Sequence, residues 1–413
     1  IGVNNNVIVI NTTSNSYSIK IEDLSPEPEP EPMPEPEPIP EPEPETYPYT
    51  LTPLGVVAGL GSSNGSYEKS NLGVSSNNYA VVGRDGGSII YYTSDNGNTW
   101  SQSNVPTLSG IGGNDADNLL RSLAISRNGQ YSVFMHRAKN HSASGSFYSD
   151  YYISSDYGAS YTKTQANYGN WGFNLNAANN EVYSQRIGFA DYSSGFKERF
   201  LISNDGETMI IPRTGWGRLY IKISANSHWY YYAITSSGTN SHTVKGIAGN
   251  ADLTNIYLTS TYNSLFIYDG VNRQSNTTPY IVQRDNWKQY WITNTGSLVS
   301  GDMNNTQPTL PTGVSFGSVK HIACSEDGEI VLFGLEGGKL HLSNDGGATF
   351  SEITDDVFTG NYNWNGLAVS SDGKMMVAIT DSESSPIYYY HHTFEKWQTY
   401  TDTIVGSTTI NMI

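Results

Sequence analysis

The sequence predicts an all-β protein in which polar turns connect many short strands. Its 413 residues include 30 Tyr and 41 Gly, and no stretch carries apolar residues at helical spacing over three turns. Tyr suits the half-buried surface of a pleated strand, and Gly adopts the backbone angles that tight turns require. Two short motifs also recur between the apolar runs, which indicates a fold made of repeated sheets.

The first repeated motif is Ser-x-Asp/Asn-Gly. Apolar residues precede each copy, and a further strand-like run follows it. Asp-Gly or Asn-Gly between two such runs is a strong signal of a β-hairpin, because Gly accepts a positive φ and the Asp or Asn side chain bonds the turn amides. Four copies occur, at residues 126–129, 203–206, 325–328 and 370–373.

The second motif reads Ser/Thr-x-Asp-x-Gly-x-Ser/Thr-aromatic and occupies residues 93–100, 154–161 and 343–350. In each copy we expect the Asp to bond the amides of a tight turn and the Gly to take the left-handed position. We expect the aromatic residue to enter the core between neighbouring sheets. The predicted structural residues are Asp95, Gly97, Trp100, Asp156, Gly158, Tyr161, Asp345, Gly347 and Phe350.

The second motif resembles the Asp box, or BNR repeat, of sialidase-like propellers. Together the two motifs define a unit of strand, turn, strand, loop, strand, box and strand, which is a four-stranded blade. Clear blades fall near residues 72–103, 121–164, 318–353 and 365–400, and weaker turn signals lie between 165 and 317. The sequence therefore predicts a β-propeller of about six four-stranded blades, or seven if the turn at 294–296 opens another.

The resemblance does not extend to the catalytic motif of sialidases, which this sequence lacks. That family places an arginine in an F/Y-R-I-P motif before the first box, whereas the only arginine upstream of Thr93 is Arg84, in the sequence Gly-Arg-Asp-Gly. The sequence Ile-Pro-Arg at residues 211–213 is reversed and lies far downstream. We therefore predict no enzymatic activity and no catalytic residue. A divergent glycoside hydrolase stays open as a second alternative, because such enzymes need only two facing carboxylates.

A Pro-Glu run separates two regions of different composition. Residues 26–45 carry proline at nearly every second position together with eight Glu. Proline removes amide donors and fixes φ, so we expect a polyproline II spacer that reaches about 60 Å. The predicted domains are residues 1–25, an N-terminal β segment; residues 26–46, the linker; and residues 47–413, the propeller.

The N-terminal segment contains two β-like runs. Twenty-five residues cannot bury such a surface alone, since an isolated hairpin is marginal in water. We therefore predict that the segment docks on protein as an added or donor strand. The predicted assembly residues are Val7, Ile8, Val9, Ile10, Tyr17, Ile19 and Ile21.

Charge and cysteine content restrict the partners of the chain. The formal net charge is −17, which disfavours nucleic acid and anionic membranes, and no apolar run approaches the roughly 20 residues of a membrane span. Cys324 is the only cysteine, so an intrachain disulfide is excluded. Candidate N-glycosylation sequons lie at Asn11, Asn64, Asn140, Asn276 and Asn304.

Metal and cofactor motifs are not found. His391 and His392 are adjacent, so their side chains should point to opposite faces of a strand and should not chelate one ion. No phosphate loop or dinucleotide fingerprint occurs, and we predict no metal and no cofactor. Aromatic clusters are expected to fill the core rather than form a sugar platform; they comprise residues 229–232 and 388–390, Trp287, Tyr290 and Trp291.

The order of segments suggests a function in assembly. A β segment, a long spacer and a closed propeller form the layout of a subunit that reaches its neighbour. We predict an extracellular structural protein, on a cell or virion surface, that forms a head-to-tail homo-oligomeric filament through its N-terminal strands. The first alternative is a glycan- or receptor-binding propeller displayed on a stalk.

Overall fold

The chain is all-β in the computed structural model, and every element described is a strand. The description covers residues 2–4, 7–11, 16–21, 51–56, 70–84, 89–106, 120–137, 147–164, 174–176, 181–184, 188–189, 200–213, 218–223, 229–233, 244–260, 263–269, 287–301, 309–382 and 385–400. Among these residues no helix is long and apolar enough to cross a membrane.

The first sheet joins the two ends of the Pro-Glu connection. Its antiparallel order is β1-β2-β3-β4, and Ile21 lies opposite Leu51 in the last pair. The predicted domain boundaries assign these strands to two units, whereas the structure places them in one sheet. The strands are β1 (Gly2–Asn4), β2 (Val7–Asn11), β3 (Ser16–Ile21) and β4 (Leu51–Val56).

The second and third sheets correspond to the first two predicted blades. Both are antiparallel with consecutive strands as neighbours, and β15 (Gly188–Phe189) adds to β11. The second contains β5 (Ser70–Val74), β6 (Ala80–Arg84), β7 (Ile90–Thr93) and β8 (Ser101–Gln102). The third contains β9 (Leu120–Ile125), β10 (Ser132–Arg137), β11 (Phe147–Ser154) and β12 (Thr162–Thr164).

The fourth and fifth sheets fill the region where the repeat is weak. The fourth has the order β13-β14-β19-β18-β17-β16 and the fifth the order β20-β21-β22-β23-β24. The fourth contains β13 (Asn174–Asn176), β14 (Glu181–Ser184), β16 (Leu201–Ile202), β17 (Thr208–Arg213), β18 (Arg218–Ile223) and β19 (Trp229–Ala233). The fifth contains β20 (Val244–Gly249), β21 (Asn255–Ser260), β22 (Ser264–Asp269), β23 (Trp287–Ile292) and β24 (Leu298–Gly301).

The sixth and seventh sheets match the last two predicted blades. Each has four antiparallel strands in chain order. The sixth contains β25 (Val319–Cys324), β26 (Val331–Leu335), β27 (Leu340–Ser343) and β28 (Ser351–Glu352). The seventh contains β29 (Trp364–Val369), β30 (Met375–Thr380), β31 (Ile387–His391) and β32 (Lys396–Tyr400).

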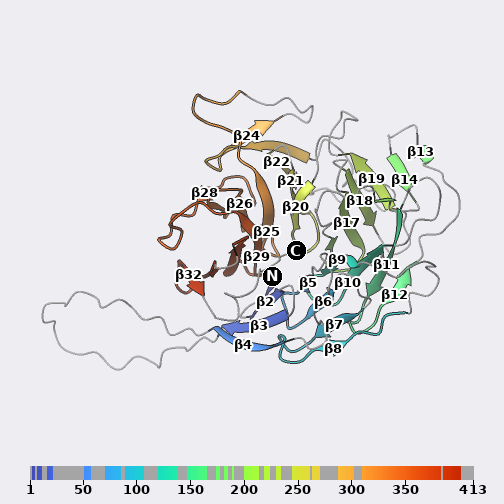
Figure 1. The fold of residues 1–413 in the computed structure, drawn as a ribbon. Helices are drawn as coiled ribbons and strands as arrows, with labels where there is room; N and C mark the ends of the chain where they lie inside the picture. The colour runs from blue at the N-terminus through green and yellow to red at the C-terminus, as the bar shows by residue number, and fades with distance from the viewer. Residues whose placement is uncertain are drawn as a thin grey trace, which may run out of the picture.

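The sheets are arranged around a common axis as a β-propeller (Figure 1). Contacts join β1, β5, β9, β16, β20, β25 and β29 in this order, and β1 in turn contacts β29. In the first, second, sixth and seventh sheets four antiparallel strands follow one another in chain order, and the third, fourth and fifth sheets add further strands to such a run. Contacts between the first and seventh sheets thus close the ring.

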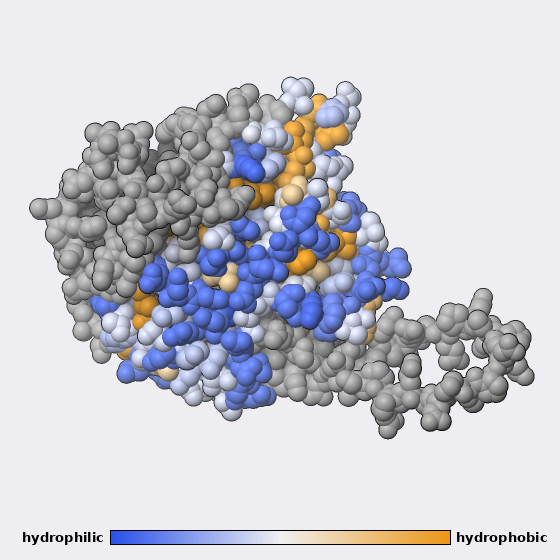
Figure 2. Space-filling view, turned by 180° about the vertical axis from the view of Figure 1, so that it is seen from behind, coloured by the Kyte–Doolittle hydropathy of each residue, from blue (hydrophilic) through white to orange (hydrophobic). Residues whose placement is uncertain are grey.

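The core consists of apolar clusters between neighbouring sheets. One cluster joins Val81 and Ile90 of the second sheet to Phe134 and Tyr152 of the third, and similar clusters join each later pair up to the seventh sheet. Alternate strand residues point to opposite faces, so both faces of a blade can pack against neighbours. Figure 2 shows polar residues over much of the described surface seen from behind.

One predicted turn has another role. The turn at residues 294–296 lies between β23 and β24, inside the fifth sheet, so it does not open a further blade. Thr293 and Gly296 form the hairpin, with the Gly296 amide donating to the Thr293 carbonyl at 2.9 Å. The alternative in which this turn opens a seventh blade is therefore wrong.

Candidate functional site

The Ser-x-Asp/Asn-Gly turns share one hydrogen-bond pattern. In the seventh sheet, the Ser370 hydroxyl donates to Asp372 at 2.7 Å, and it accepts the Met375 amide at 2.9 Å. Asp372 also accepts the Lys374 amide at 3.0 Å. The other three turns repeat these bonds, and all four glycines have φ between 71° and 82°. The pattern of Ser, Asp/Asn and Gly therefore forms the hairpins that the sequence predicts.

These four turns, together with the equivalent turns at residues 75–78 and 250–253, are also bonded to one another around the axis. The amide of the second turn residue donates to the corresponding carbonyl in the next turn. The pairs are Ser76 to Arg127, Asn204 to Ala251, Ala251 to Glu326 and Glu326 to Ser371, at 2.6–2.9 Å. Between the third and fourth sheets a side chain replaces this link, with the Asn128 amide donating to Asn204 Oδ1 at 2.9 Å. The turns thus form a belt, named here the inner belt, at one end of the axial channel.

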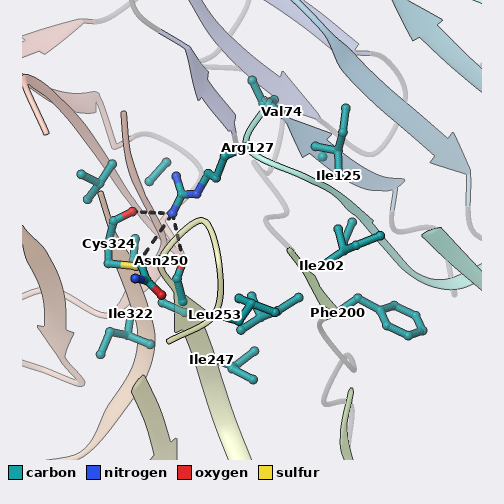
Figure 3. A pocket seen from close by; sticks show the side chains of 18 of the residues that line it. Val74, Ile125, Arg127, Phe200, Ile202, Ile247, Asn250, Leu253, Ile322 and Cys324 are labelled. Carbon is teal, nitrogen blue, oxygen red and sulfur yellow. Dashed lines mark hydrogen bonds between the residues drawn. The ribbon is translucent and has the colours of Figure 1, made fainter. Parts of the chain in front are cut away.

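Arg127 reaches across the axis from this belt (Figure 3). Its Nη2 donates to the Cys324 carbonyl at 2.6 Å and to the Gly249 carbonyl at 3.4 Å, on two other sheets. A charged donor on a carbonyl is a stronger bond than a neutral one. Within the described residues the guanidinium forms no ion pair. Arg127 therefore connects three sheets across the channel.

The axial cavity below Arg127 has a volume of about 220 Å³. The inner strands line it mainly with aliphatic side chains, and Arg127, Asn250 and Cys324 supply the polar ones; no Asp or Glu is among these lining residues. Burial raises the pKa of the Cys324 thiol to about 11, although the nearby Arg127 charge opposes that rise. The thiol is therefore neutral near pH 7 and behaves as an apolar core group.

Glu326 is the acidic residue of the inner belt at the turn position equivalent to Arg127. Its Oε1 accepts from Asn204 Nδ2 at 3.2 Å, and its Oε2 accepts from the Ser371 hydroxyl. Because Asn204 and Ser371 belong to different sheets, this carboxylate also ties the ring together. Arg127 and Glu326 occupy equivalent turn positions and both act as links between sheets.

The nine residues predicted from the second motif lie in three loops of the same geometry. In the sixth sheet, Asp345 Oδ1 accepts the Ser343 hydroxyl at 2.7 Å and the Thr349 amide at 2.9 Å, while Oδ2 accepts the Thr349 hydroxyl at 2.6 Å. The Gly347 amide donates to Ser343 Oγ at 2.8 Å, and Gly347 has a φ of 83°. The loops at Asp95 and Asp156 repeat these bonds. These three segments are named here the outer loops.

The aspartates of the outer loops are held in the ionised state. Hydrogen bonds from the Thr349 side chain and amide lower the pKa of Asp345 to about 2. At Asp95 and Asp156 burial acts to raise the pKa, but the bonds from the following Thr or Ser outweigh it, so the pKa is lowered there too. Hydrogen bonds that favour the charged form explain all three shifts.

The aromatic residues of the outer loops pack in different ways. Tyr161 is buried in the cluster between the second and third sheets, and its hydroxyl lies 2.8 Å from Ser132 Oγ. Phe350 is half-buried and packs against the cluster between the fifth and sixth sheets, with its ring 4.7 Å from that of Phe333. Trp100 is half-buried and packs against residues of its own sheet. The predicted position between neighbouring sheets is therefore confirmed for Tyr161 and Phe350. For Trp100 it stays a prediction, because the side chains of the adjoining first sheet lie outside the described residues. Val81 of the second sheet lies so close to Gly158 that a Cβ at position 158 would come within 2.5 Å of it.

The histidine pair differs from the prediction. The rings of His391 and His392 lie 4.9 Å apart, because β31 ends at His391 and strand alternation does not extend to the next residue. In the described part of the chain no group of three or more His, Cys, Asp or Glu residues is placed to hold a metal ion. The predicted core aromatics Trp287, Trp291 and Tyr388 are buried, as expected.

The predicted assembly residues lie in β2 and β3, within the first sheet. The register places Ile8 opposite Ile19 and Ile10 opposite Tyr17. Among the sequons, Asn11 is the last residue of β2. The sequons at Asn64, Asn140, Asn276 and Asn304, like the Pro-Glu run, lie outside the described residues.

Comparisons with known proteins concern the fold. No protein-family model and no curated protein matches the chain. Similar solved structures include a GH74 xyloglucanase from Xanthomonas campestris (12% identity, TM-score 0.45, 80% of this chain and 46% of that chain) and YCF48 bound to D1 peptide (13%, 0.46, 94% and 98%). Another is the β-propeller domain of Cps50 (Swd1) from Myceliophteria thermophila (10%, 0.45, 80% and 83%). The chain thus spans less than half the length of the xyloglucanase.

Proposed function

We propose that the chain is a subunit of an extracellular filament, in which β1–β3 of one copy complete the propeller of the next. In this proposal the propeller has seven blades of the Asp-box type, one for each sheet, and the outer loops are its Asp boxes. The strands β1–β3 form most of the first blade. Their contacts with β4, β5 and β29 are then made between copies rather than within one chain.

The pairing of β3 with β4 across residues 22–50 carries this proposal. Ile21 and Leu51 are register partners, so the two ends of the connection lie side by side. The Pro-Glu run within it, residues 26–45, is expected to extend over about 60 Å. Pairing within one chain requires this stiff segment to turn back on itself. Pairing between copies uses the same strand contacts and lets the segment stay extended.

Exchange of identical elements between copies needs no new interface. Domain swapping reuses contacts that the monomer already makes, so its enthalpic cost is small. If each copy donates its strands forward and accepts those of the copy behind, the contact is heterologous and does not close, which produces a filament. The sequons and the acidic charge are consistent with an extracellular surface, and they are the basis for that part of the proposal.

Shortening the connection tests the proposal. Replacing residues 22–50 with a short Asn-Gly hairpin turn forces β3 to pair with β4 of its own chain. We expect the full chain to form filaments in negative-stain electron microscopy and the shortened chain to form folded single particles. A same-length connection that keeps every proline but replaces each Glu of residues 26–45 with Gln is the matched control, because it stays extended, and it should still form filaments. Filaments from the shortened chain, or single particles from the full chain, would contradict the proposal.

A further inference from the structure

A small cleft lies at the end of the propeller that carries the turns, between the second and third sheets. Its volume is about 410 Å³, within the size range of small-molecule sites. The turn between β5 and β6, the turn between β9 and β10 and the outer loop after β11 supply its walls. The lining residues are all polar and uncharged: Asn77, Asn78, Tyr79, Asn128, Gln130 and Tyr157.

Two tyrosines form the aromatic wall of this cleft. Tyr79 and Tyr157 stack with ring centroids 4.2 Å apart and an angle of 27° between their planes. Gly129 packs on Tyr79, where a Cβ would come within 2.7 Å of the ring. The stack fixes the ring of Tyr157, yet 38% of this residue stays exposed. The cleft therefore presents a preorganised aromatic surface to solvent.

Tyr157 occupies a backbone position that tyrosine rarely adopts. Its φ is 62°, in the left-handed region, and the equivalent positions of the other outer loops hold Asn96 and Gly346, with φ of 59° and 67°. Asn and Gly tolerate this region, whereas a bulky side chain there is strained. Strained residues that persist on an exposed surface are a feature of binding sites. Loop geometry alone does not require tyrosine here.

The polar groups of the cleft are only partly used within the protein. The Asn128 side chain is bonded within the protein: its Oδ1 accepts from the Ser126 hydroxyl and from the backbone amide of Gln130, and its Nδ2 donates to the Asn204 carbonyl. Asn77 Nδ2 donates to the Asn128 carbonyl at 3.2 Å. In the described part of the chain, the side-chain amides of Asn78 and Gln130 make no hydrogen bond. The phenol groups of Tyr79 and Tyr157 likewise make none there.

We propose that this cleft binds a neutral saccharide, with Tyr157 packing on the sugar ring and Asn78 and Gln130 bonding its hydroxyls. A side-chain amide both donates and accepts, so it matches the paired capacity of a hydroxyl. An exposed tyrosine offers a flat apolar face with a polar tip, which suits the C–H face of a pyranose. No Lys or Arg lines the cleft, so nothing there compensates a sulfate or carboxylate. The cleft does not involve β1–β4, and this inference is independent of the filament.

Affinity for oligosaccharides of defined charge tests this inference. The full chain is screened against neutral gluco-, manno-, galacto- and N-acetylglucosamine oligosaccharides and against sialylated and sulfated counterparts. A neutral ligand found in this way is then titrated by calorimetry. Tyr157→Asn places the residue of the equivalent loop at position 157, so the fold is retained and the melting temperature should stay the same or rise. We expect this variant to bind at least about tenfold more weakly, because one aromatic contact is lost.

Two further variants make the result specific. Gln130→Ala should weaken binding by about threefold or more, the loss of one hydrogen bond. Ile89→Ala is the matched control, since Ile89 lies just before β7, is 39% exposed and is not among the cleft residues, and it should leave affinity unchanged. No binding to any neutral member of the panel, binding of acidic members alone, or undiminished binding by a folded Tyr157→Asn variant would each overturn the inference.

Discussion

The inner belt and the outer loops use similar residues to connect different parts of the propeller. In both, a Ser or Thr hydroxyl donates to an Asp or Asn two residues later, and a glycine takes a positive φ. In the outer loops the hydrogen bonds of the Asp side chain stay within the loop, as when Asp345 accepts from Ser343 and Thr349. The inner belt adds bonds between sheets, including those of Arg127 and Glu326. The outer loops also bond to the preceding sheet through backbone carbonyls, which accept from the Asn104 amide at 2.9 Å and from the Tyr257 hydroxyl at 3.2 Å. A change in a belt side chain that spans sheets should therefore cost more stability than a change in a loop side chain that bonds only within its loop.

The largest difference is expected from two glycines with similar backbone angles. Gly206 of the inner belt has a φ of 71°, and a Cβ there would come within 2.4 Å of the Tyr131 ring. Gly346 of an outer loop has a φ of 67°, but its nearest neighbour lies at 3.8 Å. Gly206→Ala combines backbone strain with overpacking and should cost about 3 kcal/mol of unfolding free energy. Gly346→Ala has only the strain and should cost about 1 kcal/mol.

Urea denaturation of the two variants measures this difference. Equal losses of unfolding free energy would show that strain, rather than contact with the preceding sheet, determines the role of the belt glycine.

The second prediction concerns the arginine across the axis. Arg127→Met keeps much of the side-chain volume but removes the bonds to the Cys324 and Gly249 carbonyls. Loss of a charged donor from buried carbonyls should lower the unfolding free energy by about 2 kcal/mol. Lys396→Met, at an exposed position of β32, is the control and should stay within about 0.5 kcal/mol. An unchanged unfolding free energy in Arg127→Met would show that the Arg127 bonds do not help to hold the sheets together.

The third prediction is a pH dependence in the outer loops. The pKa of Asp345 is about 2 in the folded chain, below its ordinary value of 3.8, so the unfolded state binds the proton first as the pH falls. The stabilisation by Asp345 is therefore complete above about pH 4 and is lost as the pH falls toward 2. Asp345→Ala should cost about 1 kcal/mol at pH 6 and nearly nothing at pH 2. Unfolding free energies of both chains between pH 2 and 6 measure this, and a constant difference would refute it.

The smallest effect is expected at an exposed hydroxyl of the same loop. Thr349→Val removes the 2.6 Å bond to Asp345 Oδ2 but keeps the backbone bond to Oδ1. Because water can replace the hydroxyl, the variant should lose only about 0.5 kcal/mol in the same denaturation assay. A loss as large as that of Arg127→Met would mean that a side-chain bond within one loop stabilises the propeller as strongly as bonds across the axis.

The sequence predicts the parts of the fold that depend on neighbouring residues. Ser370, Asp372 and Gly373 bond within one turn, so their spacing alone identifies the hairpin. Four predicted blades agree with the second, third, sixth and seventh sheets for this reason. The pairing of β3 with β4 could not be predicted, because the long connection separates Ile21 from Leu51 and neither strand carries a turn signal toward the other.

Arg127, which bonds across the axis, and Tyr157, which lines the proposed saccharide cleft, both lie at variable positions of the two motifs. Arg127 fills the x of Ser-x-Asn-Gly, and Tyr157 fills the x before the glycine of an outer loop. A motif search ignores such positions, because they do not contribute to the turn itself. The available signal was the contrast between copies: Tyr157 stands where Asn96 and Gly346 stand elsewhere, at a positive φ in all three. Residues that break a repeat without serving its geometry are therefore the ones to examine for function.

The most direct measurement of the proposed exchange of β1–β3 is a disulfide between two differently labelled copies. Lys20 and Thr52 are register partners across β3 and β4, so a Lys20→Cys chain is mixed with a Thr52→Cys chain under unfolding conditions and refolded together. Each variant alone serves as the control, and the buried Cys324 should not react. The proposal predicts a covalent heterodimer on oxidation of the mixture. Monomers in the mixture, together with an intrachain disulfide in the double variant, would show that each chain closes its own propeller and would contradict it.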